Sequence, residues 1–242
     1  MASPAEVAGP AGLDGPVDAV SAPPAPRGTR TVLRDRPFVV FTLLMLGYGL
    51  VYAQSTTTLP VVMAHQGFST AQYGLLLTVN GLLLVALQLP TARLLARWSR
   101  TAVLTVSVLV TGVGFGLHAF ATTWALYAVA AAVWTLGEMG TFPVAQSVAA
   151  DLTRADLRGR YLGVYSFSFS AATALAPLLG GHVLDLWGAR TLWTGVFVLA
   201  GVVALGHRLT APARQAAITR RATERSVEPG VAVAGATSRQ RG

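Results

Sequence analysis

The sequence predicts an all-α integral membrane protein with six transmembrane helices, and three observations support this fold class. Hydrophobic residues make up 53% of the 242 residues and charged residues only 12%, and the mean hydropathy is +0.55. Apolar stretches recur that can each cross a bilayer, because a helix of about 20 residues spans the hydrocarbon core. The arginines fall almost entirely on one side of these stretches, as expected for membrane-spanning helices.

Polar or turn-forming residues separate the apolar segments and define the predicted helices. No charged residue occurs between Arg36 and Arg93, which leaves room for two spans. In the first gap, "AHQGFSTAQ" (64–72), Ser69 or Thr70 can cap the second helix at its N-terminus. The six helices are expected near residues 38–61, 73–92, 102–120, 123–147, 161–183 and 190–207.

The composition divides the chain into three parts. Residues 32–208 form the six-helix transmembrane domain. Residues 1–31 contain too few large apolar side chains to build a core, so we expect a disordered cytoplasmic segment. This segment is not expected to be a signal peptide, because its start is acidic and no apolar run follows. Residues 209–242 are expected to be a disordered, Arg-rich cytoplasmic tail that can lie against anionic lipid head groups.

The basic residues predict the orientation in the membrane. All eighteen are arginines, and with six spans all of them except Arg190 fall on the same side. Because basic residues in short loops accumulate on the cytoplasmic side, we expect a multi-pass protein of the cell membrane with both termini cytoplasmic. The net charge of +8 then reflects topology, and no nucleic-acid partner is predicted. Trp98 and Tyr161 at the inner boundary and Trp124 and Trp187 at the outer one agree with this orientation.

Several sequence motifs follow one another in a defined order. They are "VLRDRPF" (32–38), Gln54 followed by Leu59 and Pro60, "YGLLLTVNGLLLVALQLP" (73–90), "GEMGTFPVAQSVAADLTRADLRGRYLG" (137–163) and "APLLGG" (176–181). From about Val32 to about Arg208, their order and spacing resemble the C-terminal half of a major facilitator superfamily transporter, most of all in its drug–proton antiporter branch. The resemblance implies half of a twelve-helix fold and proton-coupled efflux of small amphiphilic or drug-like solutes by alternating access.

The chain departs from the resembled family in two ways. Complete members have twelve helices, so a six-helix chain is expected either to need a partner half, which is a second copy of itself or a separately encoded N-terminal half, or to be a truncated C-terminal half. The alternative function is therefore that of a non-autonomous half-transporter fragment. In addition, the loop "PTARLLARWSR" (90–100) is basic but lacks the Asp and the glycines of the family signature Gly-x-x-x-Asp-Arg-x-Gly-Arg-Arg. A gate that depends on that Asp is not expected here.

One carboxylate, Glu138, interrupts the apolar sequence of the fourth predicted helix. It lies roughly 15 residues, or about 20 Å, from the outer end of that helix. Because an ionised carboxylate in the hydrocarbon costs at least about 2.5 kcal/mol, Glu138 should face the bundle, a cavity or a partner. Loss of water there favours the protonated form, and in the resembled family acidic residues of this helix serve proton coupling. Glu138 is thus the predicted proton-coupling residue; the alternative is a protonated side chain that only hydrogen-bonds a neighbouring helix.

Uncharged polar side chains and helix-bending residues complete the predicted transport machinery. The substrate-cavity candidates are Gln54, Asn80 and Gln146, although such groups, Gln88 included, can also simply connect helices. The predicted helix bends lie at Pro143, Pro177, Gly180 and Gly181, and inert kinks are the alternative.

Charged residues at the cytoplasmic end of the fourth and fifth helices suggest a gate. The segment "DLTRADLRGRYLG" (151–163) contains acidic and basic residues in close succession. The candidates for a salt-bridged cytoplasmic gate are Asp151, Asp156, Arg158 and Arg160. The alternative is that these residues only determine topology.

The residue types argue against catalysis and metal binding. The chain has no cysteine, and none of its four histidines has a partner at metal-ligand spacing, so no metal and no cofactor are predicted. Neither His-Glu-x-x-His nor Gly-x-Ser-x-Gly occurs, and no second carboxylate lies at the depth of Glu138. An intramembrane enzyme is therefore only a remote alternative, and no catalytic residue is predicted.

Overall fold

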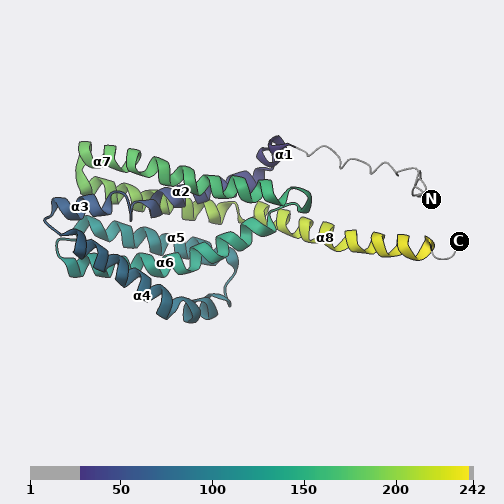
Figure 1. Ribbon diagram of the computed structural model, residues 1–242, viewed down its shortest axis with the longest axis horizontal. Helices are drawn as coiled ribbons and strands as arrows, with labels where there is room; N and C mark the ends of the chain where they lie inside the picture. The colour runs from purple at the N-terminus through teal and green to yellow at the C-terminus, as the bar shows by residue number, and fades with distance from the viewer. Residues whose placement is uncertain (1–27, 240–242) are drawn as a thin grey trace, which may run out of the picture.

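The computed structural model describes residues 28–239 of the chain, with side chains to residue 225, and this part contains helices and no strand. The all-α membrane fold predicted from the sequence is confirmed (Figure 1). Its elements are α1 (Thr29–Leu33), α2 (Arg36–Ala53), α3 (Leu59–His65), α4 (Thr70–Leu95), α5 (Arg100–Leu117), η1 (His118–Phe120), α6 (Trp124–Asp151), η2 (Ala155–Leu157), α7 (Arg158–Leu209) and α8 (Ala211–Arg239).

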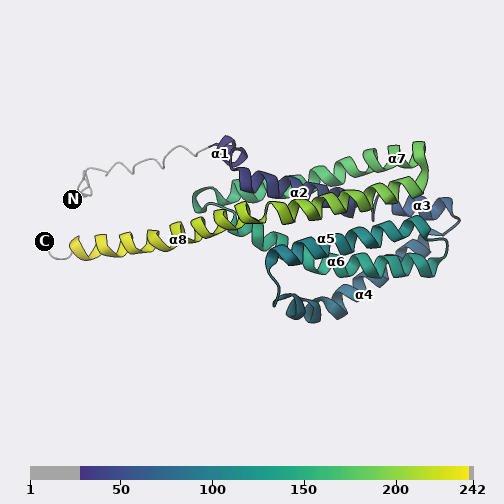
Figure 2. The ribbon, with the colours of Figure 1, turned by 180° about the vertical axis from the view of Figure 1, so that it is seen from behind.

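Five of the described helical segments are long and apolar enough to cross a membrane, and the last one is long enough to cross it twice. A straight helix with the 52 residues of α7 would be about 78 Å long, more than twice the hydrocarbon thickness. The backbone of Gly188 leaves the helical conformation (φ 76°, ψ 171°), and α7 turns back there into a second, antiparallel arm (Figure 2). The turn separates the fifth and sixth predicted helices, so α7 provides two antiparallel arms and the described bundle has six long helical arms.

The first predicted helix, 38–61, is interrupted in the structure. The helix α2 ends at Ala53 and α3 begins only at Leu59. The hydroxyl groups of Thr56 and Thr57 both donate to the carbonyl oxygen of Ala53, at 3.3 and 2.8 Å, and thereby offer the backbone an alternative to the helical pattern. In contrast, the predicted start of the second helix is confirmed, because Ser69 caps α4 and forms a capping box with Gln72.

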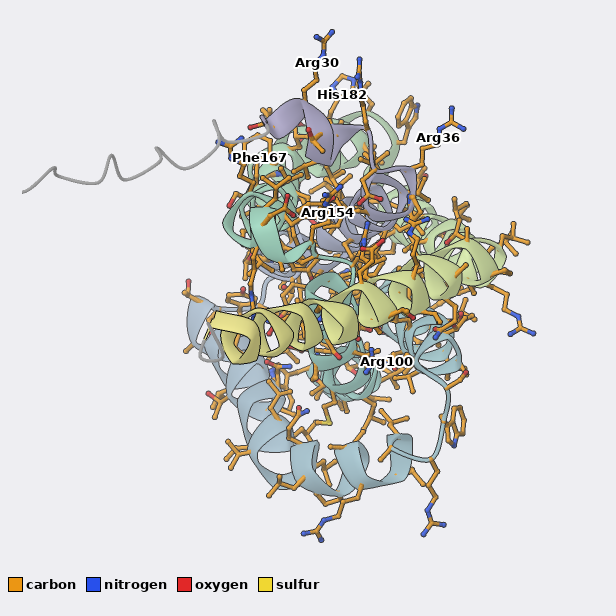
Figure 3. All side chains as sticks on the ribbon, turned by 90° about the vertical axis from the view of Figure 1, so that its right-hand side faces the viewer. Arg30, Arg36, Arg100, Arg154, Phe167 and His182 are labelled. Atoms are coloured by element: carbon orange, nitrogen blue, oxygen red, sulfur yellow. The ribbon has the colours of Figure 1, made fainter. Side chains whose placement is uncertain are left out.

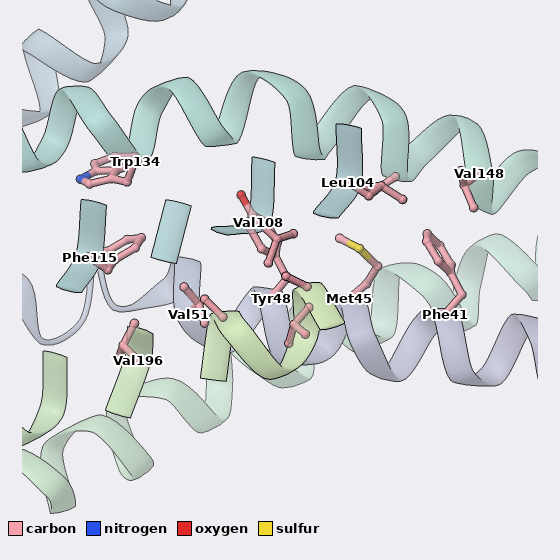
Figure 4. Packing of buried hydrophobic residues seen from close by; sticks show 14 of the residues in the cluster. Phe41, Met45, Tyr48, Val51, Leu104, Val108, Phe115, Trp134, Val148 and Val196 are labelled. Carbon is pink, nitrogen blue, oxygen red and sulfur yellow. The ribbon is translucent and has the colours of Figure 1, made fainter. Parts of the chain in front are cut away.

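The core of the bundle lies between α2, α5, α6 and the two arms of α7. Figure 4 shows Met45 and Tyr48 from α2 facing Leu104 and Val108 from α5. Gly137 of α6 lets this helix approach α5 closely, because a Cβ atom added there would lie only 2.5 Å from the backbone nitrogen of Thr111. Such small residues permit the close helix contacts on which membrane bundles depend.

The helix α4 lies at the edge of the bundle and packs mainly on α6 (Figure 1). Leu76 is its only fully buried residue within the described chain. Apolar side chains such as Leu82, Val85 and Leu89 are exposed by 65%, 85% and 70%. This face of α4 is therefore free to contact lipid or another polypeptide.

We predicted a disordered tail beyond residue 209, and the structure describes Ala211–Arg239 as the helix α8. Arg214, Ala217 and Arg221 are buried, and their spacing of three and four residues places them on one helical face. This face packs on the end of the bundle that carries α1, so tertiary contacts hold residues 211–225 in place although the composition of the tail suggests disorder. Of the predicted N-terminal disordered segment, residues 1–27 lie outside the described residues, and α1 begins within its last three residues.

Candidate functional site

The carboxyl group of Glu138 lies inside the bundle, near the middle of α6, with the residue only 8% exposed. The hydroxyl group of Tyr52, from α2, donates a hydrogen bond of 2.8 Å to Oε1. The amide nitrogen of Asn80, from α4, donates a hydrogen bond of 3.1 Å to Oε2. Glu138 thus connects three helices that are far apart in the sequence.

Neighbouring side chains fix the two donors of this carboxylate. The Asn80 amide also donates to the hydroxyl oxygen of Thr135 at 2.9 Å, and that hydroxyl donates to the Ala131 carbonyl oxygen at 2.6 Å. The Tyr52 ring makes an edge contact with Phe142, with ring centroids 5.0 Å apart. The donors are therefore held in place by packing and by their own hydrogen bonds, which preorganises the site.

Neutral groups alone satisfy the Glu138 carboxyl group. In the described part of the chain no arginine or histidine forms an ion pair with it. A tyrosine hydroxyl can donate or accept, and an amide side chain carries both donors and an acceptor. The same neighbours can consequently stabilise a carboxylate and, after reorientation, a protonated carboxyl group. Chemically, the site can bind and release one proton without leaving an unpaired cation behind.

The structure brings together only some of the predicted polar candidates. Asn80 contacts Glu138 directly, whereas Gln146 is exposed on α6, eight residues or about 12 Å further along the helix. Gln54 is buried elsewhere: its Oε1 accepts from the Thr58 hydroxyl at 2.7 Å, and a Cβ atom at Gly180 would overlap with it. Gln54 therefore lies at the contact between α2 and α7, beside a cavity of about 150 Å³. Gln88 donates to the Met139 carbonyl oxygen at 3.3 Å and connects α4 to α6.

The predicted bend residues lie within continuous helices. Pro143 is inside α6, five residues after Glu138, and Pro177 is inside the first arm of α7. Gly180 contacts α2 as described, while no atom lies near the position of a Cβ at Gly181. The sharp change of direction in α7 occurs at Gly188, which we did not select from the sequence.

The predicted gate residues Asp151 and Asp156 form ion pairs at the end of the bundle that carries α1 and α8. Asp151 pairs with Arg100, and Asp156 accepts from Arg154 Nε at 3.2 Å. Arg158 is exposed and Arg160 is partly buried. The Arg100–Asp151 and Arg154–Asp156 pairs are largely accessible to solvent and contribute little to stability individually.

A more deeply buried ion pair at this end involves residues that the sequence did not single out as gate residues. Asp35, at the start of α2, pairs with Arg221 of α8, whose side chain is 4% exposed. Asp35 also accepts from the Tyr161 hydroxyl at 2.6 Å, and Arg221 donates to the Leu152 carbonyl oxygen. Nearby, burial lowers the pKa of the Arg214 guanidinium, which remains charged at physiological pH. The helix α8 is thereby fastened to α2, α6 and α7.

Sequence reasoning missed Tyr52 and Thr135 as partners in the central site. Thr135 lies three residues before Glu138, so the helical period could have placed both on one face. Tyr52 could not have been found in this way, because its contact with Glu138 joins residues 86 positions apart.

Comparison with known proteins agrees with this architecture. Residues 38–207 match the sequence profile of the Major Facilitator Superfamily. The uncharacterized MFS-type transporter YttB of Bacillus subtilis is 28% identical over 167 residues, covering 67% of this chain and 42% of YttB. The multidrug resistance protein MdtH of Cronobacter sakazakii is 26% identical over 195 residues, covering 76% of this chain and 46% of MdtH. The chain thus spans less than half the length of these curated relatives. The chain belongs to the major facilitator superfamily.

Proposed function

We propose that this chain is one six-helix half of a proton-coupled transporter that exports small amphiphilic or drug-like solutes, with Glu138 as the proton carrier. The observation that carries this proposal is the Glu138 carboxyl group, buried at mid-helix and held only by the neutral donors Tyr52 and Asn80. An intramembrane carboxyl group without a cationic partner has the environment of a proton relay. Family membership points to a transporter rather than to an enzyme, and the name of MdtH supports multidrug efflux as the class of transport.

The remaining transport candidates extend this proposal. Asn80 would couple the protonation of Glu138 to the position of α4, since it contacts the carboxyl group directly. Gln54 and Gln146 would contact solute only if the cavity between two halves reaches them. Pro143 and Pro177 would allow α6 and α7 to bend during alternating access.

The partner half is part of the proposal. Transport sites in such folds lie between two repeats of helices, and this chain spans less than half of its relatives' length. The exposed apolar face of α4 offers a surface for the second half. That half would be a second copy of this chain or a separately encoded six-helix chain.

We also propose that both termini are cytoplasmic and that Asp151, Asp156, Arg158 and Arg160 belong to a cytoplasmic gate. The orientation is supported by the arginines at the end of the bundle that carries α1 and α8, since Arg36 begins α2, Arg100 pairs with Asp151 at the end of α6, and Arg154 lines a cavity together with Arg221 of α8. Arg190 lies at the other end, where its guanidinium group is 5.4 Å from the centre of the Phe120 ring.

The test measures proton flux in proteoliposomes that contain the full chain. The interior of the vesicles is made acidic relative to the outside. Ethidium, a lipophilic cation, is then added outside, and a pH dye trapped in the vesicles reports the interior pH. We expect ethidium to accelerate proton release, and Glu138→Gln to reduce this acceleration at least tenfold while ethidium exchange without a gradient persists. Glu224→Gln is the matched control, because Glu224 is an exposed glutamate of α8.

Two outcomes would contradict parts of the proposal. Proton release that is unchanged in Glu138→Gln would exclude Glu138 as the carrier. Absence of any ethidium-dependent flux from the wild-type chain, together with a monomeric mass in light scattering, would exclude a transporter made of two copies. It would leave a separately encoded partner as the only form of the proposal.

A further inference from the structure

A cavity of about 520 Å³ opens at the cytoplasmic end of the bundle. Its wall combines the junction of α1 and α2, the loop before η2, the start of α7 and the side of α8. The charged side chains in this wall are Arg34, Asp35, Arg36, Arg154, Arg220, Arg221 and Glu224. Five arginines against two carboxylates give the cavity a clear excess of positive charge.

The excess cannot be neutralised by the acids in the wall. Asp35 is already paired with the buried Arg221, and Glu224 lies 3.8 Å from Arg220 in an exposed pair. Arg154 is paired with Asp156, which lies outside the wall. Within the part of the chain that the structure describes, the side chains of Arg34 and Arg36 form neither a hydrogen bond nor an ion pair, and both residues are exposed. Their guanidinium groups are therefore available to a ligand.

The cavity lies at the level where the membrane-spanning helices begin. Arg36 is the first residue of α2, and Tyr161 is in the first turn of α7. In Figure 3, which views the bundle from this end, Arg154 lies between α1 and α8. A group bound here would be at the depth of the lipid head groups rather than in the hydrocarbon.

The geometry and charge favour one class of ligand. Guanidinium groups donate paired hydrogen bonds to phosphate oxygens, which makes arginine well suited to phosphate recognition. The cytoplasmic leaflet supplies anionic head groups to basic sites at its surface. We propose that this cavity binds the phosphate group of an anion, either the head group of an anionic phospholipid or a free phosphate compound. This inference does not depend on the proposed transport activity.

The test measures ligand binding to the full chain by native mass spectrometry in a neutral detergent. The probes are phosphatidylglycerol, the zwitterionic phosphatidylcholine as a lipid control, and pyrophosphate as a soluble phosphate. The Arg34→Gln/Arg36→Gln variant removes the two unpaired arginines of the cavity. The Arg93→Gln/Arg97→Gln variant is the matched control, because it removes two exposed arginines that lie outside the cavity, near the end of α4.

We expect one phosphatidylglycerol molecule to bind more tightly than phosphatidylcholine. The cavity variant should weaken this binding by roughly 25-fold, since each basic residue near a membrane surface contributes about fivefold in affinity. The control variant should bind as the wild type does. Because all four residues are exposed, both variants should unfold at the wild-type temperature without added lipid, which separates loss of binding from loss of fold.

Other outcomes would identify a soluble ligand or overturn the proposal. Selective loss of pyrophosphate binding in the cavity variant, without any preference for phosphatidylglycerol, would support the cavity with a soluble phosphate as its ligand. If neither probe binds the wild type, or if the two variants lose binding equally, the cavity is not a phosphate site and the proposal is overturned.

Discussion

Two carboxyl groups, Glu138 in the middle of the bundle and Asp35 at the end that carries α1 and α8, are satisfied in opposite ways. Glu138 has only neutral donors, Tyr52 and Asn80, whereas Asp35 is paired with the buried guanidinium group of Arg221. If Glu138 takes up a proton, no opposite charge remains buried in the bundle. If Asp35 loses its charge, Arg221 is left without compensation, which is costly in a buried setting. The comparison separates a group suited to carry a proton from one suited to hold a helix in place.

The largest expected effect comes from Gly137→Val, which disrupts the close packing of α6 against α5. The added side chain would overlap with backbone atoms of Ser107 and Thr111 in α5, which cannot move aside as a flexible side chain could. We expect a loss of more than about 3 kcal/mol in the free energy of unfolding, beyond the usual cost of overpacking. The measurement is unfolding by sodium dodecyl sulfate in mixed micelles, followed by circular dichroism. Gly81→Val is the control, because no atom lies near a Cβ at Gly81; equal losses in both variants would refute close packing as the cause.

A smaller effect is expected when each acid is replaced by its amide. Asp35→Asn should reduce the free energy of unfolding by about 2–3 kcal/mol, somewhat less than the ~3–5 kcal/mol for breaking a fully buried pair, because the Asp35 side chain is still 11% exposed. It should also expose α8 to limited proteolysis. Glu138→Gln should cost less than about 1 kcal/mol, because an amide oxygen can still accept a hydrogen bond. The same unfolding assay checks both values. If Glu138→Gln lost more unfolding free energy than Asp35→Asn, the comparison between the two carboxyl groups would be contradicted.

The smallest expected effect concerns the hydrogen bond between Tyr52 and Glu138. Tyr52→Phe removes one donor to Glu138 and should lower the free energy of unfolding by about 1 kcal/mol. Combined with Glu138→Gln in a double-mutant cycle, it should give a coupling energy of at least about 0.5 kcal/mol, as residues in direct contact do. Strictly additive losses would mean that the Tyr52 hydroxyl does not interact energetically with the Glu138 side chain.

The sequence indicated a large part of the fold because membrane solvation leaves local signals. Apolar length marked the spans, and Ser69 in the first gap between them marked the start of α4 correctly. The sequence also indicated Glu138 and Asn80, since polar side chains are rare in an apolar helix. It did not reveal the break after Ala53, where threonine hydroxyls compete with helical hydrogen bonds. Nor did it reveal that α8 is ordered, because the partners of Arg221 lie on distant segments.

By itself, the sequence determined that this protein is a helical membrane protein with a carboxyl group inside its fourth span. These properties follow from the cost of placing charge and unpaired backbone groups in hydrocarbon, and that cost acts on each segment separately. Only the tertiary structure decided that Tyr52 and Asn80 hold Glu138, and that Asp35 fastens α8. These contacts join residues 86, 58 and 186 positions apart. Their partners are selected by the packing of whole helices, which no local pattern of residues records.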